Sequence, residues 1–130
     1  MSWISLLHNP EGISAVYQGD PPALSDVRVR EVTLHEDGPV LRMRVDLPRY
    51  PSMPPRKWTA QGFNTVQIEI SFSGLRTVTL EGFGSEVTAS ISLSGDDGVH
   101  VDVRSPEMRI EAVSDTAHIS QLTAYADTAK

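Results

Sequence analysis

Histidine is the side chain in this sequence best suited to proton transfer or metal binding near neutral pH. The chain has four histidines, His8, His35, His100 and His118, and no cysteine. No pair of them has the H-E-x-x-H or H-x-H spacing of a metal site. His100 and Asp102 share one face of a predicted strand, but zinc there would need a third ligand from another strand. We therefore expect no catalytic residue, no metal ion and no cofactor.

Motifs for nucleophiles and phosphate binding are missing as well. No serine lies in the G-x-S-x-G elbow of hydrolases. Residues 82–84 read Gly-Phe-Gly, but no helix with an apolar stripe follows to bind a phosphate at its first turn. Residues 95–98, Gly-Asp-Asp-Gly, lack the ligand spacing of a calcium loop and predict a turn. The sequence favours a protein that binds a partner and argues against an enzyme.

Length and charge restrict the class of protein further. The chain has 130 residues, which predicts one domain over 1–130. Its net charge is −6, which disfavours nucleic acid and anionic membrane as partners but suits a basic protein. The same charge also simply keeps a small domain soluble. The absence of cysteine, and a start that lacks the basic and apolar parts of a signal peptide, predict a cytoplasmic protein.

The first part of the chain is helical in pattern. Apolar residues recur three and four apart in two stretches, which predicts one or two short helices within about residues 2–18. Asn9 reads as a cap, with Pro10 at the first helical position. Gly19 ends the second helix, which we expect to reach about Gln18. Helices this short need a larger element to lie against.

From residue 26 the apolar pattern changes to a period of two, which is typical of strands. A one-residue shift after Arg30 predicts a bulge in the first strand. Residues 118–126 fit either a helical stripe or a closing strand, and we expect the strand. The result is a mainly β protein with hairpin-joined antiparallel strands, arranged as a twisted sheet, a sandwich or an open barrel. Seven or eight strands are predicted, at 27–34, 41–47, 66–72, 75–83, 87–94, 99–104, from 108, and at 118–126.

Residues 48–57 form a separate proline-rich loop. They contain four of the nine prolines and no alternating pattern, which predicts extended, polyproline-like chain on the surface. An ordered loop with Tyr50 and Met53 that ends at Trp58 is a candidate binding segment. The alternative is that Tyr50 and Trp58 fold back as anchors on the core.

Charged residues are unevenly distributed along the predicted sheet. One hairpin carries four outward arginines, with three acidic residues placed to offset them across strands: Arg28, Arg30, Arg42 and Arg44, against Glu31, Asp46 and Glu69. Acidic residues gather in two predicted turns, Glu36 and Asp37 in one and Asp96 and Asp97 in the other. A polarised surface of this kind steers a partner of opposite charge. Charge pairs across strands are also ordinary surface decoration.

Several of these features together resemble a family of immunity proteins from bacterial polymorphic toxin systems, the family numbered fifty. The similarity extends from Trp3 to about Tyr125 and depends on the order and spacing of the following residues: Trp3, Leu6, Asn9-Pro10, Ile13, Tyr17, Leu24, Pro54-Pro55-Arg56-Lys57-Trp58, Asn64, the strand 66–72, and Tyr125. Membership implies an essentially all-β domain, encoded beside a toxin gene, that binds the cognate toxin and blocks it. Trp3 and Trp58 match aromatic positions of the family.

The sequence therefore predicts a non-catalytic immunity protein whose partner is a toxin domain. Its predicted contact residues are Tyr50, Met53, Trp58, Glu36, Asp37, Asp96 and Asp97. The alternative is a carrier that encloses a small apolar ligand in its barrel or sandwich. Either a monomer or a homodimer fits, since an exposed sheet edge can pair two copies. The identity and chemistry of the toxin, and the surface that binds it, stay open.

Overall fold

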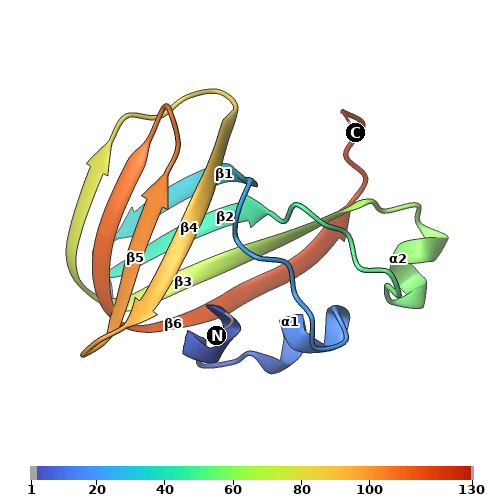
Figure 1. Ribbon diagram of the computed structural model, residues 1–130, viewed down its shortest axis with the longest axis horizontal. Coiled ribbons are helices and arrows are strands. Elements are labelled where there is room, and N and C mark those ends of the chain that lie inside the picture. The colour runs from blue at the N-terminus through green and yellow to red at the C-terminus, as the bar shows by residue number, and fades with distance from the viewer. Residues whose placement is uncertain (1–2, 130) are drawn as a thin grey trace.

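Period-two alternation produces six strands in the computed structural model, which describes residues 3–129 (Figure 1). Ser2, where the first predicted helix begins, lies outside the described residues. A 3-10 helix, η1 (Trp3–Leu6), and the helix α1 (Glu11–Val16) precede the strands. The remaining elements are β1 (Val27–His35), β2 (Val40–Asp46), α2 (Arg56–Ala60), β3 (Thr65–Glu81), β4 (Val87–Gly95), β5 (Val99–Arg104) and β6 (Arg109–Tyr125).

The strands form one antiparallel sheet that closes into a barrel in the order β1-β2-β3-β6-β5-β4. The prediction of a mainly β protein with short N-terminal helices is confirmed. The barrel is closed, whereas the predicted barrel was open; a short pairing of β1 with β4 over Val27–Val29 closes it. The bulge in β1 is confirmed too, because its register with β2 shifts between Val29 and Glu31.

Six strands replace the predicted seven or eight because β3 and β6 are each 17 residues long. Both run through positions that were predicted as breaks, Ser73-Gly74 in β3 and residues 114–116 in β6. Gly74 has a φ of +65°, and a Cβ there would lie 2.8 Å from the Cβ of Asp115. The missing side chain therefore lets the two strands bend together without separating. The prediction of a strand over 118–126 is confirmed, with its end at Tyr125.

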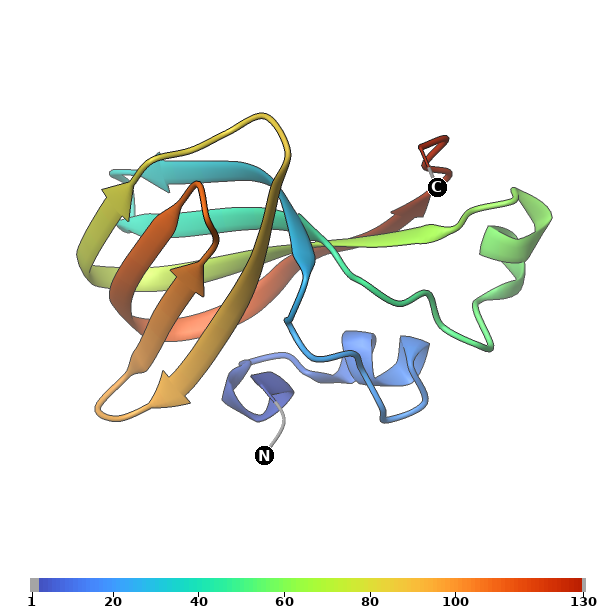
Figure 2. The same ribbon diagram turned by 45° about the horizontal axis from the view of Figure 1, so that its top comes forward.

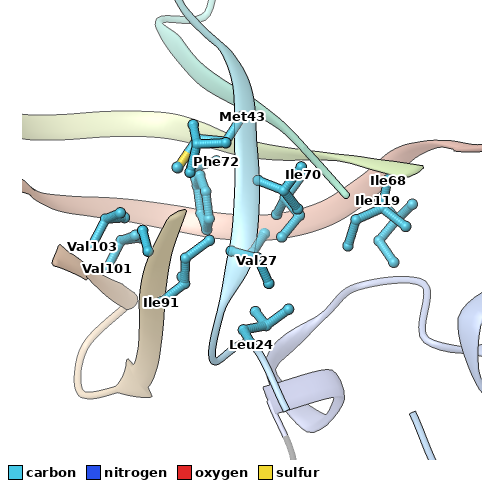
Figure 3. Packing of buried hydrophobic residues seen from close by; sticks show 14 of the residues in the cluster. Leu24, Val27, Met43, Ile68, Ile70, Phe72, Ile91, Val101, Val103 and Ile119 are labelled. Atoms are coloured by element: carbon cyan, nitrogen blue, oxygen red, sulfur yellow. The ribbon is translucent and has the colours of Figure 1, made fainter. Parts of the chain in front are cut away.

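The barrel interior is filled by apolar side chains from every strand. Met43, Ile70 and Phe72 meet Val27 and Ile91 near the middle of the barrel (Figure 3), and all five are at most 7% exposed. Burial of a side chain of this size stabilises the fold by about 1.5–3 kcal/mol. The alternating pattern of the sequence thus places one face of each strand in a common core.

The N-terminal segment is fastened to β6. Asn9 does not cap α1, because Pro10 occupies the cap position and no side chain caps the helix. The Asn9 side chain instead donates to the backbone oxygen of Ile119 and accepts from the Ile119 amide, both at 2.9 Å. The Asn9 side chain thus forms with Ile119 the two hydrogen bonds that a residue of a neighbouring strand would form. The helix ends at Val16, two residues before the predicted end, since Gln18 has a φ of +49°.

The proline-rich loop is not extended throughout. Its last part forms α2, in which the amides of Trp58 and Thr59 donate to the backbone oxygen of Pro55 at 3.0 and 3.3 Å. Pro55 itself has extended dihedral angles and its fixed φ suits the start of a helix. The sequence prediction missed this helix because it is only five residues long.

Candidate functional site

The polar side chains that could carry chemistry stabilise turns and pair with one another. His100 makes a 2.8 Å contact between Nε2 and the backbone oxygen of Asp96, within the β4–β5 turn. Asp102, its neighbour on β5, accepts from Arg104 at 2.9 Å between side-chain atoms. His35 accepts from the amide of Asp37 at 3.1 Å. Over residues 3–129, no three histidine, aspartate or glutamate side chains gather as a metal site would require.

The aromatic residues of the proline-rich loop pack mainly inward. The rings of Tyr50 and Trp58 lie 6.2 Å apart at 41°, and both side chains lie against the core cluster. Burial raises the pKa of Tyr50, whose hydroxyl is enclosed and has no hydrogen-bond partner within the described residues. Met53 is the exception, with 70% of its surface exposed. The pair of rings thus matches the alternative interpretation of core anchors, and Met53 is left as the accessible member.

The two predicted acidic turns both adjoin the bend of β3. The amide of Leu75 donates to the backbone oxygen of Pro39, in the turn that holds Glu36 and Asp37, at 3.0 Å. The Arg76 guanidinium donates to the backbone oxygen of Asp97, in the other turn, at 2.7 Å. The structure therefore brings the two acidic turns, which are 60 residues apart in the numbering, to one end of the barrel.

The acidic turns and the proline-rich loop lie at opposite ends of the molecule. Figures 1 and 2 show α2 at the far right and the β1–β2 turn at the left, with the first half of β3 between them. Residues 65–73 of β3, at about 3.3 Å per residue, span roughly 30 Å. The seven predicted contact residues therefore form two separate groups and not one patch.

A further surface, which the sequence did not reveal, lies where β1 diverges from the barrel wall. Past Val29, β1 pairs only with β2 in the described part of the chain. Past Ser73, β3 has left β2 and, within residues 3–129, pairs only with β6. We call the opening between these two free edges the open seam; it is bounded by residues 31–35 of β1, residues 77–81 of β3 and the link 82–86 that leads to β4. In Figure 2 this link runs along the same side of the barrel as β1.

Apolar side chains are exposed in the open seam because the wall is incomplete there. Leu34 pairs with buried Leu41 and Leu80 pairs with buried Ile110, so both face the barrel interior. Leu34 is nonetheless 49% exposed and Leu80 43%, and Phe83 in the link is 55% exposed. Three of the four large exposed apolar side chains of residues 3–129 thus gather around one opening.

A hollow of about 340 Å³ lies within the open seam. It is lined by Val32 of β1, by Leu80 and Phe83, and by buried Met108 just before β6. The hollow is open to solvent. Exposed apolar surface of this kind, surrounded by polar residues, is typical of protein-binding sites. No sequence motif predicts the open seam. Its apolar side chains are exposed because β1 and β3 each lack a partner strand on one side there, within the described residues, and not because of their residue types.

Carboxylates surround the open seam. Glu36, Asp37, Glu81, Glu86 and Glu107 are all exposed, and none has an ion-pair partner within the described residues. Two of the nearby basic side chains are occupied, whereas Arg42, opposite Thr33 of β1, has no ion-pair partner among the described residues. Arg30 pairs with Asp46 and Asp127, and Arg44 pairs with Glu31, as the charge pattern predicted. Around the seam, carboxylates without an ion pair therefore outnumber arginines without one in the described part of the chain.

The outer face of the sheet beside the seam is held by a polar network around Asp46, which is 5% exposed. Its Oδ2 accepts from Arg30 at 2.7 Å and from Tyr125 at 2.5 Å, and its Oδ1 accepts from Gln67 at 2.9 Å. Burial opposes ionisation of this carboxyl, but the three hydrogen bonds outweigh it and lower the pKa of Asp46. The network joins β1, β2, β3 and β6, so it fixes the position of Arg30 at the border of the seam.

None of the helices of residues 3–129 has the length and apolar character needed to cross a membrane.

Comparison with known proteins identifies the family. The model of the family described as Immunity protein 50 matches residues 9–125, which include every strand of the barrel. No curated protein and no solved structure matches the chain. The matched range begins at Asn9, whose side chain is hydrogen-bonded to the backbone of Ile119, and ends at Tyr125, which donates to Asp46. The chain belongs to the Immunity protein 50 family.

Proposed function

We propose that this protein binds a cognate toxin domain and neutralises it, by occlusion and without catalysis, in the cell that makes both. The match to the immunity family over residues 9–125 is the observation that carries the proposal. The net charge of −6 and the exposed apolar surface of the open seam support a protein partner with a basic surface. The seven contact residues predicted from the sequence remain predictions.

Co-expression tests the proposal directly. The C-terminal domain encoded by the adjacent gene is induced in a bacterial host with and without this protein, and any complex is recovered by pull-down. Rescue of growth together with a stable complex is the expected result. Continued toxicity despite good expression of this protein would contradict the proposal for that toxin.

Occlusion and catalysis differ in stoichiometry. If the protein acts by binding, residual toxin activity falls linearly as protein is added and reaches zero at one equivalent. Toxin released from the complex by denaturation and refolding then has its original mass and activity. Inactivation by a small fraction of an equivalent would show that the protein acts as an enzyme.

The sequence-predicted contact residues are tested in the same complex. Replacing Asp96 and Asp97 together by Ala removes two carboxylates from one turn, and a weaker complex is expected if that turn belongs to the interface. Unchanged affinity would remove these two residues from the set.

A further inference from the structure

We propose that the open seam receives an extended segment of the toxin, which adds as a strand to the free edge of β1 and carries basic residues at its ends. This inference rests on the proposed function and specifies where and how the partner binds. Residues 31–35 of β1 are the docking edge, and the hollow beside Phe83 receives one apolar side chain of the segment.

The free edge of β1 can form a new ladder. Residues 31–35 are in strand conformation and are held on one side by β2, from Glu31 opposite Arg44 to His35 opposite Val40. On their other side no strand pairs with them in the described part of the chain. In a strand, backbone amides and carbonyls point alternately to the two sides, so part of those on β1 point into the seam. Native proteins usually block such an edge with charge, proline or a covering loop. The link 82–86 borders the seam but forms no ladder with residues 31–35 in the described part of the chain, so backbone groups on that side of β1 can accept another strand.

The apolar lining determines how side chains of the added strand are arranged. A strand placed beside β1 has every second side chain on the face that Leu34 occupies. That face opens on the hollow of about 340 Å³ lined by Val32, Leu80, Phe83 and Met108. An apolar side chain inserted there covers Phe83 and Leu80, which are 55% and 43% exposed in the free protein. The segment therefore has an apolar residue at alternate positions.

The charges around the seam favour basic ends for the segment. Glu36 and Asp37 lie beyond one end of the docking edge, and Glu81, Glu86 and Glu107 lie along the opposite border, all without ion-pair partners among the described residues. Lysine or arginine beside them gains attraction without breaking an existing pair. Steering by such a field also speeds association at low ionic strength.

A second copy of this chain is a poor occupant of the same edge. Pairing β1 with β1 would place the acidic seam of one copy against that of the other. Like charges at an interface oppose association, and each copy already carries a net charge of −6. The observations therefore favour a basic segment of another protein.

The test uses the complex of this protein with the toxin domain encoded by the adjacent gene, measured by titration calorimetry and stopped-flow association. Phe83→Ser removes the exposed aromatic of the seam, and we expect the complex to weaken by about tenfold or more. Met53→Ser removes the exposed apolar side chain at the opposite end, near α2, and we expect a smaller loss. Circular dichroism and thermal melting check that each variant is folded.

Charge reversal gives a matched pair of variants. Glu36 and Glu11 are both exposed glutamates without ion-pair partners within the described residues. Glu36→Lys is expected to slow association several-fold at low salt, with the difference shrinking as salt is added. Glu11→Lys, on α1, changes the net charge equally and leaves the rate near that of the unaltered protein.

Amide hydrogen exchange of the unaltered protein needs no substitution. Formation of the complex is expected to protect alternate amides within residues 31–35, those that point away from β2. Equal affinities for all four variants, with unchanged exchange at residues 31–35, would overturn the docking site while leaving the immunity function intact. Protection of the same amides in a dimer of this protein alone would contradict the proposal that a basic segment of the toxin occupies this edge. If the unaltered protein forms no complex, both proposals fall.

Discussion

The phenolic oxygen of Tyr125 donates a 2.5 Å hydrogen bond to Oδ2 of Asp46, and so ties the end of β6 to the end of β2 across β3. Gln67 on β3 and Arg30 on β1 complete the coordination of the same carboxylate. Four neighbouring strands therefore share one buried anion. Because its partners come from distant parts of the sequence, the network forms only when the barrel wall is assembled.

Removal of the charge at Asp46 is expected to destabilise the fold. Asp46→Asn removes the nearer of the two carboxylates that pair with Arg30 and places an amide NH2 group against hydrogen-bond donors, which costs about 2 kcal/mol in the free energy of unfolding. Tyr125→Phe deletes one hydrogen bond and costs about 1 kcal/mol. Urea unfolding measures both. Asp26→Asn, at an exposed position without an ion pair in the described residues, serves as the control and is expected to change little. Equal stabilities for Asp46→Asn and the control would contradict the structural role of the network.

Stability is expected to fall on the acid side because of the same carboxylate. The pKa of Asp46 is lowered in the folded protein, since the hydrogen bonds that it accepts outweigh the effect of burial. Its contribution is therefore present above its unfolded pKa of about 3.9 and is lost as pH falls through the lower folded pKa. Urea midpoints between pH 6 and pH 2.5 should fall less steeply for Asp46→Asn than for the unaltered protein. Parallel curves would show that other groups cause the acid response.

On the alkaline side, the phenol of Tyr17 should lose its proton at a higher pH than an exposed tyrosine does. Burial raises the pKa of Tyr17 to about 12, partly opposed by nearby Arg49, and its hydroxyl donates to the Arg49 backbone oxygen at 2.6 Å. A raised folded pKa means that this contribution to stability is complete below the unfolded pKa of about 10 and is lost as pH rises toward 12. Ultraviolet titration of the phenolates should show one fewer late group in Tyr17→Phe than in the unaltered protein.

The bend of β3 should be intolerant of a side chain. Gly74→Ala places a Cβ 2.7 Å from Cγ of Asp115 at a φ of +65°, so both the backbone and its neighbour are strained. We expect a loss of about 1–3 kcal/mol, measured by thermal melting. Gly62→Ala is the comparison, because its φ is also positive, +68°, but nothing lies within 4 Å of an added Cβ. A loss no larger than that of Gly62→Ala would show that contact with Asp115 has no cost.

Most of the fold could be predicted from local sequence patterns. The alternation in β2 and β4 predicted both strands and their buried faces, because period two needs no knowledge of partners. The bends at Gly74 and Ser114 were wrongly predicted as breaks, since small residues signal a turn unless a paired strand bends with them. Asn9 was wrongly predicted as a helix cap, because its hydrogen-bond partner, Ile119, is 110 residues away and cannot be recognised from the local sequence.

The candidate surface was less accessible to prediction. Exposed acidic turns follow from composition, and the structure places them at the surface as expected. The open seam does not follow, because Leu34 and Leu80 have the inward phase of core residues. Their exposure depends on where β1 leaves β4 and where β3 leaves β2, which is a property of the assembled barrel.

The two long strands have a consequence for the rate at which the protein folds. β3 and β6 pair along almost their whole lengths, from Thr65 opposite Tyr125 to Glu81 opposite Arg109, and each runs through both halves of the barrel. Most of their contacts join residues far apart in sequence, and chains with such high contact order fold over milliseconds to seconds. Neither half of the barrel can become native before the last strand is synthesised. Under the proposed function, protection against the toxin begins only after β6 has been synthesised, so the timing of synthesis relative to the toxin becomes part of the protein's action.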